Sequence, residues 1–282
     1  MNIVAIFTVY NEEAIIERAI RHLAAQGVAS YVVDNESTDR TREIVEGLRG
    51  KGVIGVEVLP REDCFALEGH LHRKEQLHRE LGADWYIHHD ADEIREAPKP
   101  YRNLAEGIIA ADRAGYNAID FHEFVFLPTS EDEDYEHEDY VEQMRYYFYL
   151  KKTTGARFRI NAWKNFSQPI DLASSAGHQV QFEGRRVYPE NFILRHYLAL
   201  SYAHVLRKYC NRSFSREEVA RGWFWTRATL RPEEVYFPDK SELKELSSDG
   251  TWDLSEPWID EPLFKNATPP EVKRGPSPCS KA

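Results

Sequence analysis

Short apolar runs alternate with amphipathic helical patterns over the first 60 residues, and this order leaves few folds open. Residues 3–9, 31–34 and 53–59 form the apolar runs, and the first is typical of a strand covered on both faces. Apolar side chains recur at helical spacing in residues 15–23 and 44–48. A strand–helix–strand–helix–strand order requires a parallel sheet with right-handed crossovers. We therefore predict an α/β fold with a Rossmann-like, mainly parallel sheet flanked by helices.

Three predicted strands of this sheet, those ending near residues 9, 34 and 89, are followed by carboxylate or amide side chains. A further helix is predicted over residues 68–81, and a fourth strand begins at Trp85. Ligands of open parallel sheets bind outside the carboxyl ends of the strands. Side chains from three strand ends are therefore expected to share one site: Thr8, Tyr10, Asn11, Glu12, Asp34, Asn35, Ser37, Asp90 and Asp92.

The acidic pair Asp90 and Asp92 follows the apolar run of the fourth strand. If the strand continues through this pair, alternation places both carboxylates on the same side. Two hard oxygen donors so placed suit Mg²⁺ or Mn²⁺, and without a metal they are expected to repel each other. The alternative is an acidic turn of purely structural importance.

Composition narrows the class of protein. The chain of 282 residues, with 42% hydrophobic residues, is long enough to bury one large core, and its net charge of −11 argues against non-specific nucleic-acid binding. Three widely separated cysteines predict free thiols in a reducing compartment. A leader-like segment and an apolar run of 18 residues are both absent, so a cytoplasmic protein without a transmembrane segment is expected. The sequence does not indicate an oligomeric state.

Three segments, residues 8–13, 33–41 and 84–93, resemble the successive signatures of family 2-like glycosyltransferases of the GT-A fold. The resemblance implies that Thr8, Tyr10, Glu12 and Asp34 line the nucleotide pocket of a nucleoside diphosphate sugar. It also implies that Asp90 and Asp92 form a DxD motif, which holds Mn²⁺ or Mg²⁺ on the donor diphosphate. Two residues of the helix 68–81 are placed to touch the donor, and the alternative for each is a solvated helix face: Arg73 and Lys74.

The second half of the chain carries further strand patterns. Residues 116–127 predict a strand, residues 145–150 and 157–163 a β-hairpin, and residues 179–182 and 192–194 two more strands, together a mixed acceptor-side β region. The acidic residues 131–139 predict a mobile solvated loop, with an acceptor-side lid as the alternative. We expect a glycosyltransferase domain over residues 1–230, whose halves are 1–95 and 96–230, and a Pro-rich, acidic, partly disordered extension over 231–282.

Candidate catalytic residues follow from the resemblance and from the chemistry. In GT-A enzymes a histidine far downstream of the DxD motif completes the metal shell, and His196 is the candidate here. An inverting transfer needs a carboxylate base on the acceptor hydroxyl. Asp171 is the first candidate and Glu123 the second, with His178 a further catalytic candidate, and retention of configuration stays open.

The predicted function is metal-dependent transfer of a sugar from a nucleoside diphosphate sugar to a saccharide or another hydroxyl acceptor. Asp34 can accept a hydrogen bond from a base N–H, which favours UDP or GDP as the nucleotide. One alternative is a sugar nucleotidyltransferase, although residues 10–13 are not the Gly-rich basic loop that such enzymes use. Another is a carbohydrate-binding protein without catalysis. Neither a GxGxxG motif nor a Walker lysine loop follows the first strand, which argues against dinucleotide and P-loop chemistry.

Overall fold

The computed structural model describes residues 1–61, 63–132, 134–150, 158–255 and 263. Two compact units share the chain. The first contains residues 1–60, 68–124 and 151–196, and the second contains residues 61–67, 125–150 and 197–282. Every predicted site residue belongs to the first unit.

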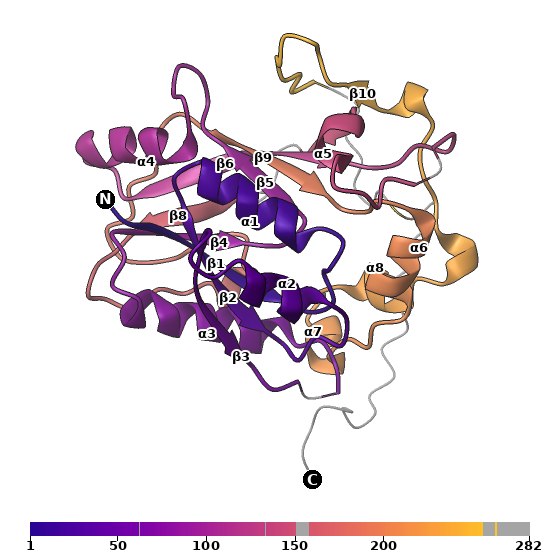
Figure 1. Ribbon diagram of the computed structural model, residues 1–282, viewed down its shortest axis with the longest axis horizontal. Coiled ribbons are helices and arrows are strands. Elements are labelled where there is room, and N and C mark those ends of the chain that lie inside the picture. Colours follow the sequence, from indigo (N-terminus) through magenta and orange to yellow (C-terminus); the bar gives the residue numbers. More distant parts are fainter. Residues whose placement is uncertain (62, 133, 151–157, 256–262, 264–282) are drawn as a thin grey trace. The chain divides into compact units, whose positions relative to one another are not determined.

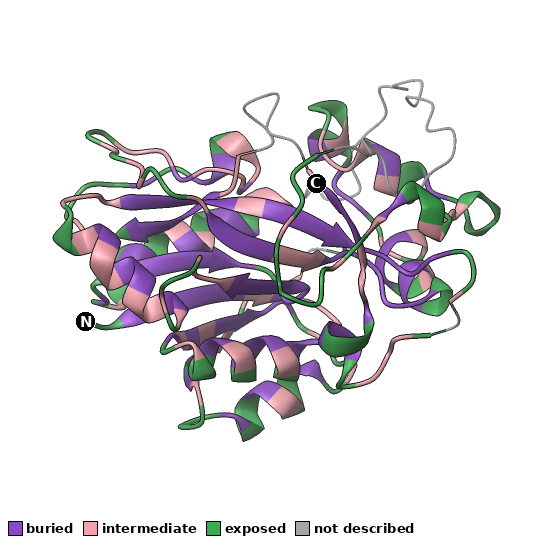
Figure 2. Ribbon diagram, turned by 90° about the horizontal axis from the view of Figure 1, so that it is seen from above, coloured by how far each residue is buried: buried purple, intermediate pink, exposed green. Residues whose placement is uncertain are grey.

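A parallel sheet forms the centre of the first unit (Figure 1). Its parallel strands are β1 (Ile3–Val9), β2 (Ala29–Asp34), β3 (Val53–Val58) and β4 (Trp85–His89), arranged in the order β3–β2–β1–β4. Strand β1 pairs in parallel with both β2 and β4 and is buried along nearly its whole length (Figure 2). Apolar residues on both faces of a strand permit this central position. The α/β prediction with a mainly parallel sheet is confirmed.

Helices connect these strands as the amphipathic patterns predict. Helix α1 spans Ile16–Ala25, α2 spans Thr41–Gly47 and α3 spans Leu67–Glu80. Helix α4 (Leu104–Arg113) is not in the prediction, although its sequence carries the signals. The Asn103 side chain caps it by accepting from the Glu106 backbone N–H at 2.9 Å, and Leu104, Ile108 and Ala111 are buried at helical spacing.

Antiparallel strands extend the sheet and form the mixed β region. Strand β8 (Ile160–Lys164) pairs with β4 and with β6 (Ala118–Phe126), while β5 (Glu93–Glu96) pairs with β9 (Phe192–Tyr197). The predicted hairpin is wrong, because β7 (Tyr146–Tyr149) pairs with β10 (Lys244–Glu245) and the strand order does not make β7 and β8 neighbours. Its predicted turn at residues 153–155 lies outside the described residues. Residues 179–182 make only isolated bridges, so the strand predicted there is also wrong.

The second unit has its own apolar core, built from residues far apart in sequence. Its helices are α5 (Tyr140–Gln143), α6 (Tyr202–Val205) with a π-helical continuation to Cys210, α7 (Arg216–Ala220) and α8 (Trp225–Thr229). Leu243 and Leu263 belong to this core, and Val235 and Phe237 pack against it. Part of the predicted C-terminal extension is therefore folded.

Two expectations about the second unit need correction. Glu136, in the acidic stretch, pairs with the Arg207 guanidinium and accepts from the Ser201 hydroxyl, so this stretch is anchored rather than freely solvated. Cys64 is disulfide-bonded, whereas Cys210 is a free thiol as predicted. None of the helices in the described part of the chain is long and apolar enough to cross a bilayer.

Candidate functional site

Two turns meet at the carboxyl ends of β1 and β2. Val9 and Asp34 are partners in the strand register, so the turns that follow them start side by side. Asn11 joins these turns, because its backbone N–H donates to the Ser37 hydroxyl at 3.0 Å and its side-chain oxygen accepts from the Thr38 N–H at 2.8 Å. Asn11 has a φ of 56°, a conformation that Asn tolerates better than most residues. Asn11 was expected only as one of the polar residues at the strand ends, and an Asn in a strand-end turn is a signal for such side-chain bonds.

The four predicted nucleotide-pocket residues lie on these strand ends and turns. Asp34 is buried, and both its carboxylate oxygens lie near the Ser37 N–H, at 3.3 and 3.2 Å. This single shared donor leaves acceptor capacity on the carboxylate. Glu12 is also buried, and its N–H donates to the Thr41 hydroxyl at 2.7 Å, while Thr8 and Tyr10 are half-buried.

The acidic pair lies in a turn, not in a strand. Strand β4 ends at His89 and β5 begins at Glu93, so strand alternation does not apply to Asp90 and Asp92. The Asp90 side chain is 52% exposed, whereas that of Asp92 is only 9% exposed. Each carboxylate has its own cationic neighbour, so the expected mutual repulsion is not the dominant interaction of either one.

Asp92 and His196 lie next to each other through strand pairing. Glu93 and His196 are register partners of the β5–β9 ladder. The His196 Nε2 lies 3.2 Å from the Asp92 Oδ2, and its Nδ1 lies 2.7 Å from the Glu123 Oε1. Arg159 closes this row, with its Nε 2.7 Å from the other Glu123 oxygen. The row therefore alternates acid, imidazole, acid and guanidinium.

Charges along this row shift the pKa values of its members. Burial alone would lower the pKa of His196, but the carboxylates of Asp92 and Glu123 raise it to about 10. Burial alone would raise the pKa of Glu123, but Arg159 and His196 lower it to about 2. Glu123 is therefore a very weak base that orients the imidazole. Arg159 was not among the predicted site residues. The sequence signal that could have identified it is its positive charge within the aromatic, strand-like residues 157–163.

Two cations of helix α3 differ in their surroundings. Lys74 is fully buried, with its Nζ 3.0 Å from the His88 Nδ1 and 3.6 Å from the Asp90 Oδ1. Burial lowers the pKa of Lys74, while Asp90 raises it in part. Arg73 forms ion pairs with Glu57 at 2.6 Å and Glu80 at 2.7 Å. Lys74, rather than Arg73, therefore lies beside the acidic turn.

The remaining catalytic candidates lie in one loop of the first unit. Asp171 is exposed, and its Oδ1 accepts from the Ser174 N–H at 2.9 Å, next to a short 3₁₀ helix at Ala173–Ser175. His178, at the other end of this loop, is half-buried and interacts electrostatically with Glu123 and His88.

The donor set at Asp92 and His196 suits a hard divalent ion. In the described part of the chain, no three His, Cys, Asp or Glu side chains converge as a preformed metal cluster. Mg²⁺ and Mn²⁺ sites on phosphate substrates often use one or two protein ligands, with water and phosphate completing an octahedron. The 3.2 Å between Asp92 Oδ2 and His196 Nε2 is a hydrogen bond, and because the His196 pKa is raised to about 10, a divalent ion would have to displace the Nε2 proton before that nitrogen could bind it. Glu123 on Nδ1 directs Nε2 toward Asp92, as carboxylates do behind metal-bound histidines.

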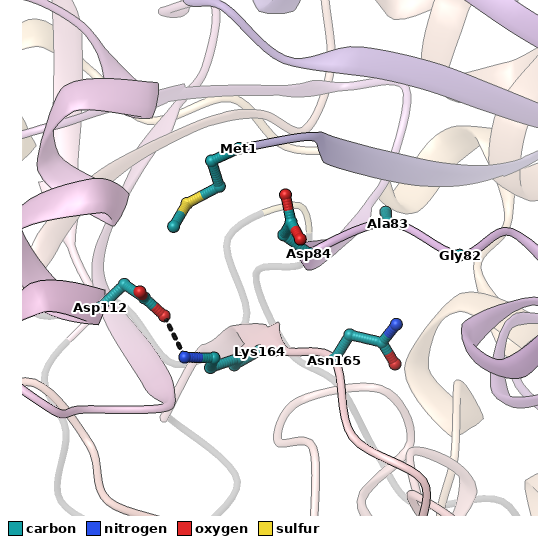
Figure 3. Close-up of a pocket in the computed structure, with 7 residues that line it drawn as sticks. All are labelled: Met1, Gly82, Ala83, Asp84, Asp112, Lys164 and Asn165. Carbon is teal, nitrogen blue, oxygen red and sulfur yellow. Dashed lines mark ion pairs between the residues drawn. The ribbon is translucent and has the colours of Figure 1, made fainter.

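A polar pocket of about 510 Å³ lies away from these residues (Figure 3). Met1 and Asp84 line it at the starting ends of β1 and β4, together with an Asp112–Lys164 ion pair of 2.7 Å. None of the predicted site residues lines this pocket. It is therefore at the opposite end of the parallel strands from the site.

Comparison with known proteins gives one family match. Residues 4–67 match the model of Glycosyl transferase family 2. No curated protein sequence matches the chain.

Solved structures share limited similarity. TarS from S. aureus in complex with UDP-GlcNAc is 20% identical, covers 47% of this chain and 36% of its own, and has a TM-score of 0.33. TarS in complex with UDP is 13% identical, covers 81% and 74%, and has a TM-score of 0.44. A UDP-glucose pyrophosphorylase complexed with UDP-glucose is 8% identical, covers 64% and 73%, and has a TM-score of 0.28. This chain thus spans about a third of the first TarS structure.

The family match covers β1, β2 and β3, with the two turns that Asn11 joins. These strands are three of the four parallel strands of the observed α/β sheet, whose fourth, β4, lies outside the match. Residues 4–67 thus match the Glycosyl transferase family 2 model, which confirms the resemblance found in the sequence for the signatures at residues 8–13 and 33–41.

Proposed function

We propose that this protein transfers a sugar from UDP or GDP to a hydroxyl acceptor, such as a saccharide, with help from Mn²⁺ or Mg²⁺. The observation that carries the proposal is the juxtaposition of Asp92 with His196, held by Glu123 behind the imidazole. This pair lies beyond the carboxyl end of β4. The two turns that Asn11 joins, which belong to the family 2 match, lie beyond the carboxyl ends of the parallel strands β1 and β2. Ligands of open α/β sheets bind at these ends.

The donor is held by groups with distinct tasks. Asp34 accepts an N–H from the base, and Thr8, Tyr10 and Glu12 line the rest of the nucleotide pocket. Asp92 and His196 would hold the divalent ion, and the exposed Asp90 would have to move to join them, because the three side chains do not converge in the described structure. The bound ion supplies charge stabilisation to the departing diphosphate. Lys74 adds a positive charge next to Asp90 and fixes the side chain of His88.

Asp171 is the base that this site supports best. It takes the proton of the acceptor hydroxyl while the hydroxyl oxygen bonds to the anomeric carbon, which inverts the configuration as the diphosphate leaves. The pKa of about 2 disfavours Glu123 for this task, and its oxygens face His196 and Arg159. His178 lies in the same loop as Asp171 and contributes positive charge when it is protonated.

The enzyme alternative, a sugar nucleotidyltransferase, lacks support at the first strand end. Such an enzyme needs a Gly-rich basic loop around the phosphates of a nucleoside triphosphate. Here the corresponding turn is held by side-chain bonds of Asn11 and carries acids at Glu12 and Glu13. A carbohydrate-binding role without catalysis would leave the paired Asp92 and His196 without a task.

Thermal unfolding with UDP, GDP, ADP and CDP, each with and without Mn²⁺, tests the nucleotide and the metal together. UDP or GDP with Mn²⁺ should raise the melting temperature most, and at a hundred times its Kd it should add about 2.7 kcal/mol to the free energy of unfolding. A larger shift with ADP or CDP would contradict the role of Asp34. Release of UDP or GDP from a panel of nucleotide sugars then reports turnover.

Asp92→Asn should abolish the Mn²⁺-dependent part of the nucleotide shift and the release of nucleotide. Asp112→Asn is a matched control, because it neutralises an ion-paired carboxylate at the opposite end of the strands. It should keep both the shift and the turnover. An Asp92→Asn protein that binds Mn²⁺ and nucleotide like the wild type would overturn the metal assignment.

A further inference from the structure

A continuous row of buried hydrogen bonds joins the acidic turn to the loop that carries Asp171. The Glu93 Oε2 accepts from the Asp90 N–H at 3.1 Å and from the Arg95 Nη2 at 2.6 Å. The same Arg95 nitrogen lies 3.2 Å from the Asn161 Oδ1. The Asn161 Nδ2 then donates to the Gly177 carbonyl at 2.8 Å, with the His178 carbonyl at 3.4 Å. All these groups lie in the first unit.

We propose that Arg95 and Asn161 are positioning residues, which hold the loop 171–178 in place relative to the donor-binding turn 90–93. The proposal rests on the proposed function, because it concerns the alignment of Asp171 with the donor. It assigns a task to two residues that touch neither substrate nor metal. Their fixed geometry sets where the acceptor is deprotonated.

Burial makes these bonds difficult to replace. Arg95 is fully buried and Asn161 is 1% exposed, so water does not compete for their partners. The Arg95 guanidinium also lies over the Phe121 ring, 4.4 Å from its centroid, which fixes its plane. One Arg nitrogen carries two hydrogens, so the Arg95 Nη2 can satisfy Glu93 and Asn161 together. Loss of either bond would leave a buried polar group without its partner, which is costly.

The loop backbone lies too close to β4 to shift freely. Gly177 has a φ of 80°, and a Cβ at this position would lie 3.0 Å from the His88 Nε2 and 3.1 Å from the Leu71 Cδ2. His88 itself is fixed by Lys74, 3.0 Å away. Asn161 therefore holds the loop at a glycine whose missing Cβ lets the backbone lie against His88 of β4 and Leu71 of α3.

Hydrogen bonds within the loop and to Glu75 tie its residues together. The Gly177 N–H donates to the Leu172 carbonyl at 2.9 Å, which closes the turn on itself. The Glu75 Oε1 accepts from the Leu172 and Ala173 N–H groups at 2.6 and 3.1 Å. The Asp171 backbone also exchanges hydrogen bonds with Gln181, at 2.9 and 2.8 Å, and the closed turn begins directly after Asp171, so the anchor at Gly177 acts on Asp171 through this turn.

Asn161→Ala should separate positioning from folding. In hydrogen exchange of the full chain, segment 171–178 should exchange at least about tenfold faster, while segment 90–93 stays protected. The Kd for UDP with Mn²⁺ should change less than twofold, and kcat for nucleotide release should fall at least about tenfold. Asn161→Asp is the second variant, because it keeps the acceptor for Arg95 and loses only the donor to Gly177, and it should give the same pattern.

Asn117→Ala is the matched control. The Asn117 side chain also joins loop backbone, donating to the Gly184 carbonyl at 3.0 Å and accepting from the Arg186 N–H at 2.6 Å. Its loss should speed exchange only around residues 184–186 and leave kcat unchanged. Unchanged exchange of residues 171–178 in both Asn161 variants, or equal losses of UDP affinity and kcat, would overturn the proposal. Exchange needs no turnover, so failure of the proposed function would appear separately, as wild-type protein that does not bind UDP with Mn²⁺.

Discussion

His196 lies between two carboxylates, and the order of these groups decides what each can do. Glu123 faces Nδ1 and Asp92 faces Nε2, so only one of the two nitrogens is directed to the acidic turn. The sequence could nominate these three residues by type, and His196 through family resemblance. It could not pair them, because 73 residues separate His196 from Glu123 and 104 separate it from Asp92. Pairing at such distances is decided by the packing of strands, which a local pattern does not encode.

His78 should make stability depend on pH. Its Nδ1 lies 3.2 Å from the Trp163 Nε1, which can only donate, so the ring proton sits on Nε2 and bonds the Phe166 carbonyl at 3.1 Å. Burial lowers the pKa of His78 in the folded protein. The unfolded chain therefore binds the proton first, and the contribution of His78 is complete above pH 6.5 and is lost as the pH falls below it.

Chemical denaturation of wild type and His78→Gln between pH 7.5 and 5 measures this effect. Below pH 6.5 the free energy of unfolding of the wild type should fall by up to about 1.4 kcal/mol per pH unit more than that of His78→Gln, because glutamine does not titrate. Identical slopes for wild type and His78→Gln would contradict the prediction.

Elements in the first 95 residues follow their sequence patterns closely, whereas later elements do not. Strands β1 to β3 are apolar runs that pair with neighbours near in sequence, so local pattern and sheet order agree. Strands β7 and β8 were predicted by their alternation, but their partners are β10, β4 and β6. Alternation identifies a half-buried strand without identifying its neighbour.

Helix α4 provides a prediction about close packing between elements. A Cβ at Gly107 would lie 2.8 Å from the Phe192 Cζ and 3.0 Å from the Ala97 Cβ, whereas a Cβ at Gly69 in α3 would meet nothing within 4 Å. Gly107→Ala should therefore lower the free energy of unfolding by about 1–3 kcal/mol through overpacking. Gly69→Ala should raise it by about 0.5–1 kcal/mol, because alanine favours helix. Urea unfolding of the two variants measures the sign of each change in the free energy of unfolding. A Gly107→Ala protein more stable than the wild type would refute the close contact.

At the scale of the whole molecule, the division into two compact units was not visible in the sequence. The chain enters the second unit at residues 61–67 and 125–150 before it returns at 197. From sequence alone, domain boundaries are expected where the composition changes, and the Pro-rich, acidic composition after residue 230 led to a predicted boundary there. The core of the second unit combines residues from both sides of that position, including Leu230 and Leu243. The boundaries predicted for a separate extension stay a prediction.

Leu243→Ala tests whether residues beyond 230 stabilise the fold. Leu243 is 8% exposed and lies in the core of the second unit, so its loss should lower the free energy of unfolding by about 2–5 kcal/mol. Leu254→Ala, at a side chain that is 43% exposed, should change it by less than about 0.5 kcal/mol. Equal, small effects in denaturant titrations would show that this part of the chain is dispensable for stability.

The β5–β9 ladder has a consequence for how such a protein can diverge. Glu93 faces His196 across this ladder, although the chain between the two strands runs from residue 97 to residue 191. Insertions in the loops of that long connection leave the ladder register intact, so acceptor-side loops can lengthen or change without displacing the imidazole. One residue inserted inside β9 ahead of His196 would instead turn His196 to the opposite face of the sheet. Insertions and deletions are therefore expected to be tolerated in the loops between β5 and β9, and to be disruptive within these two strands.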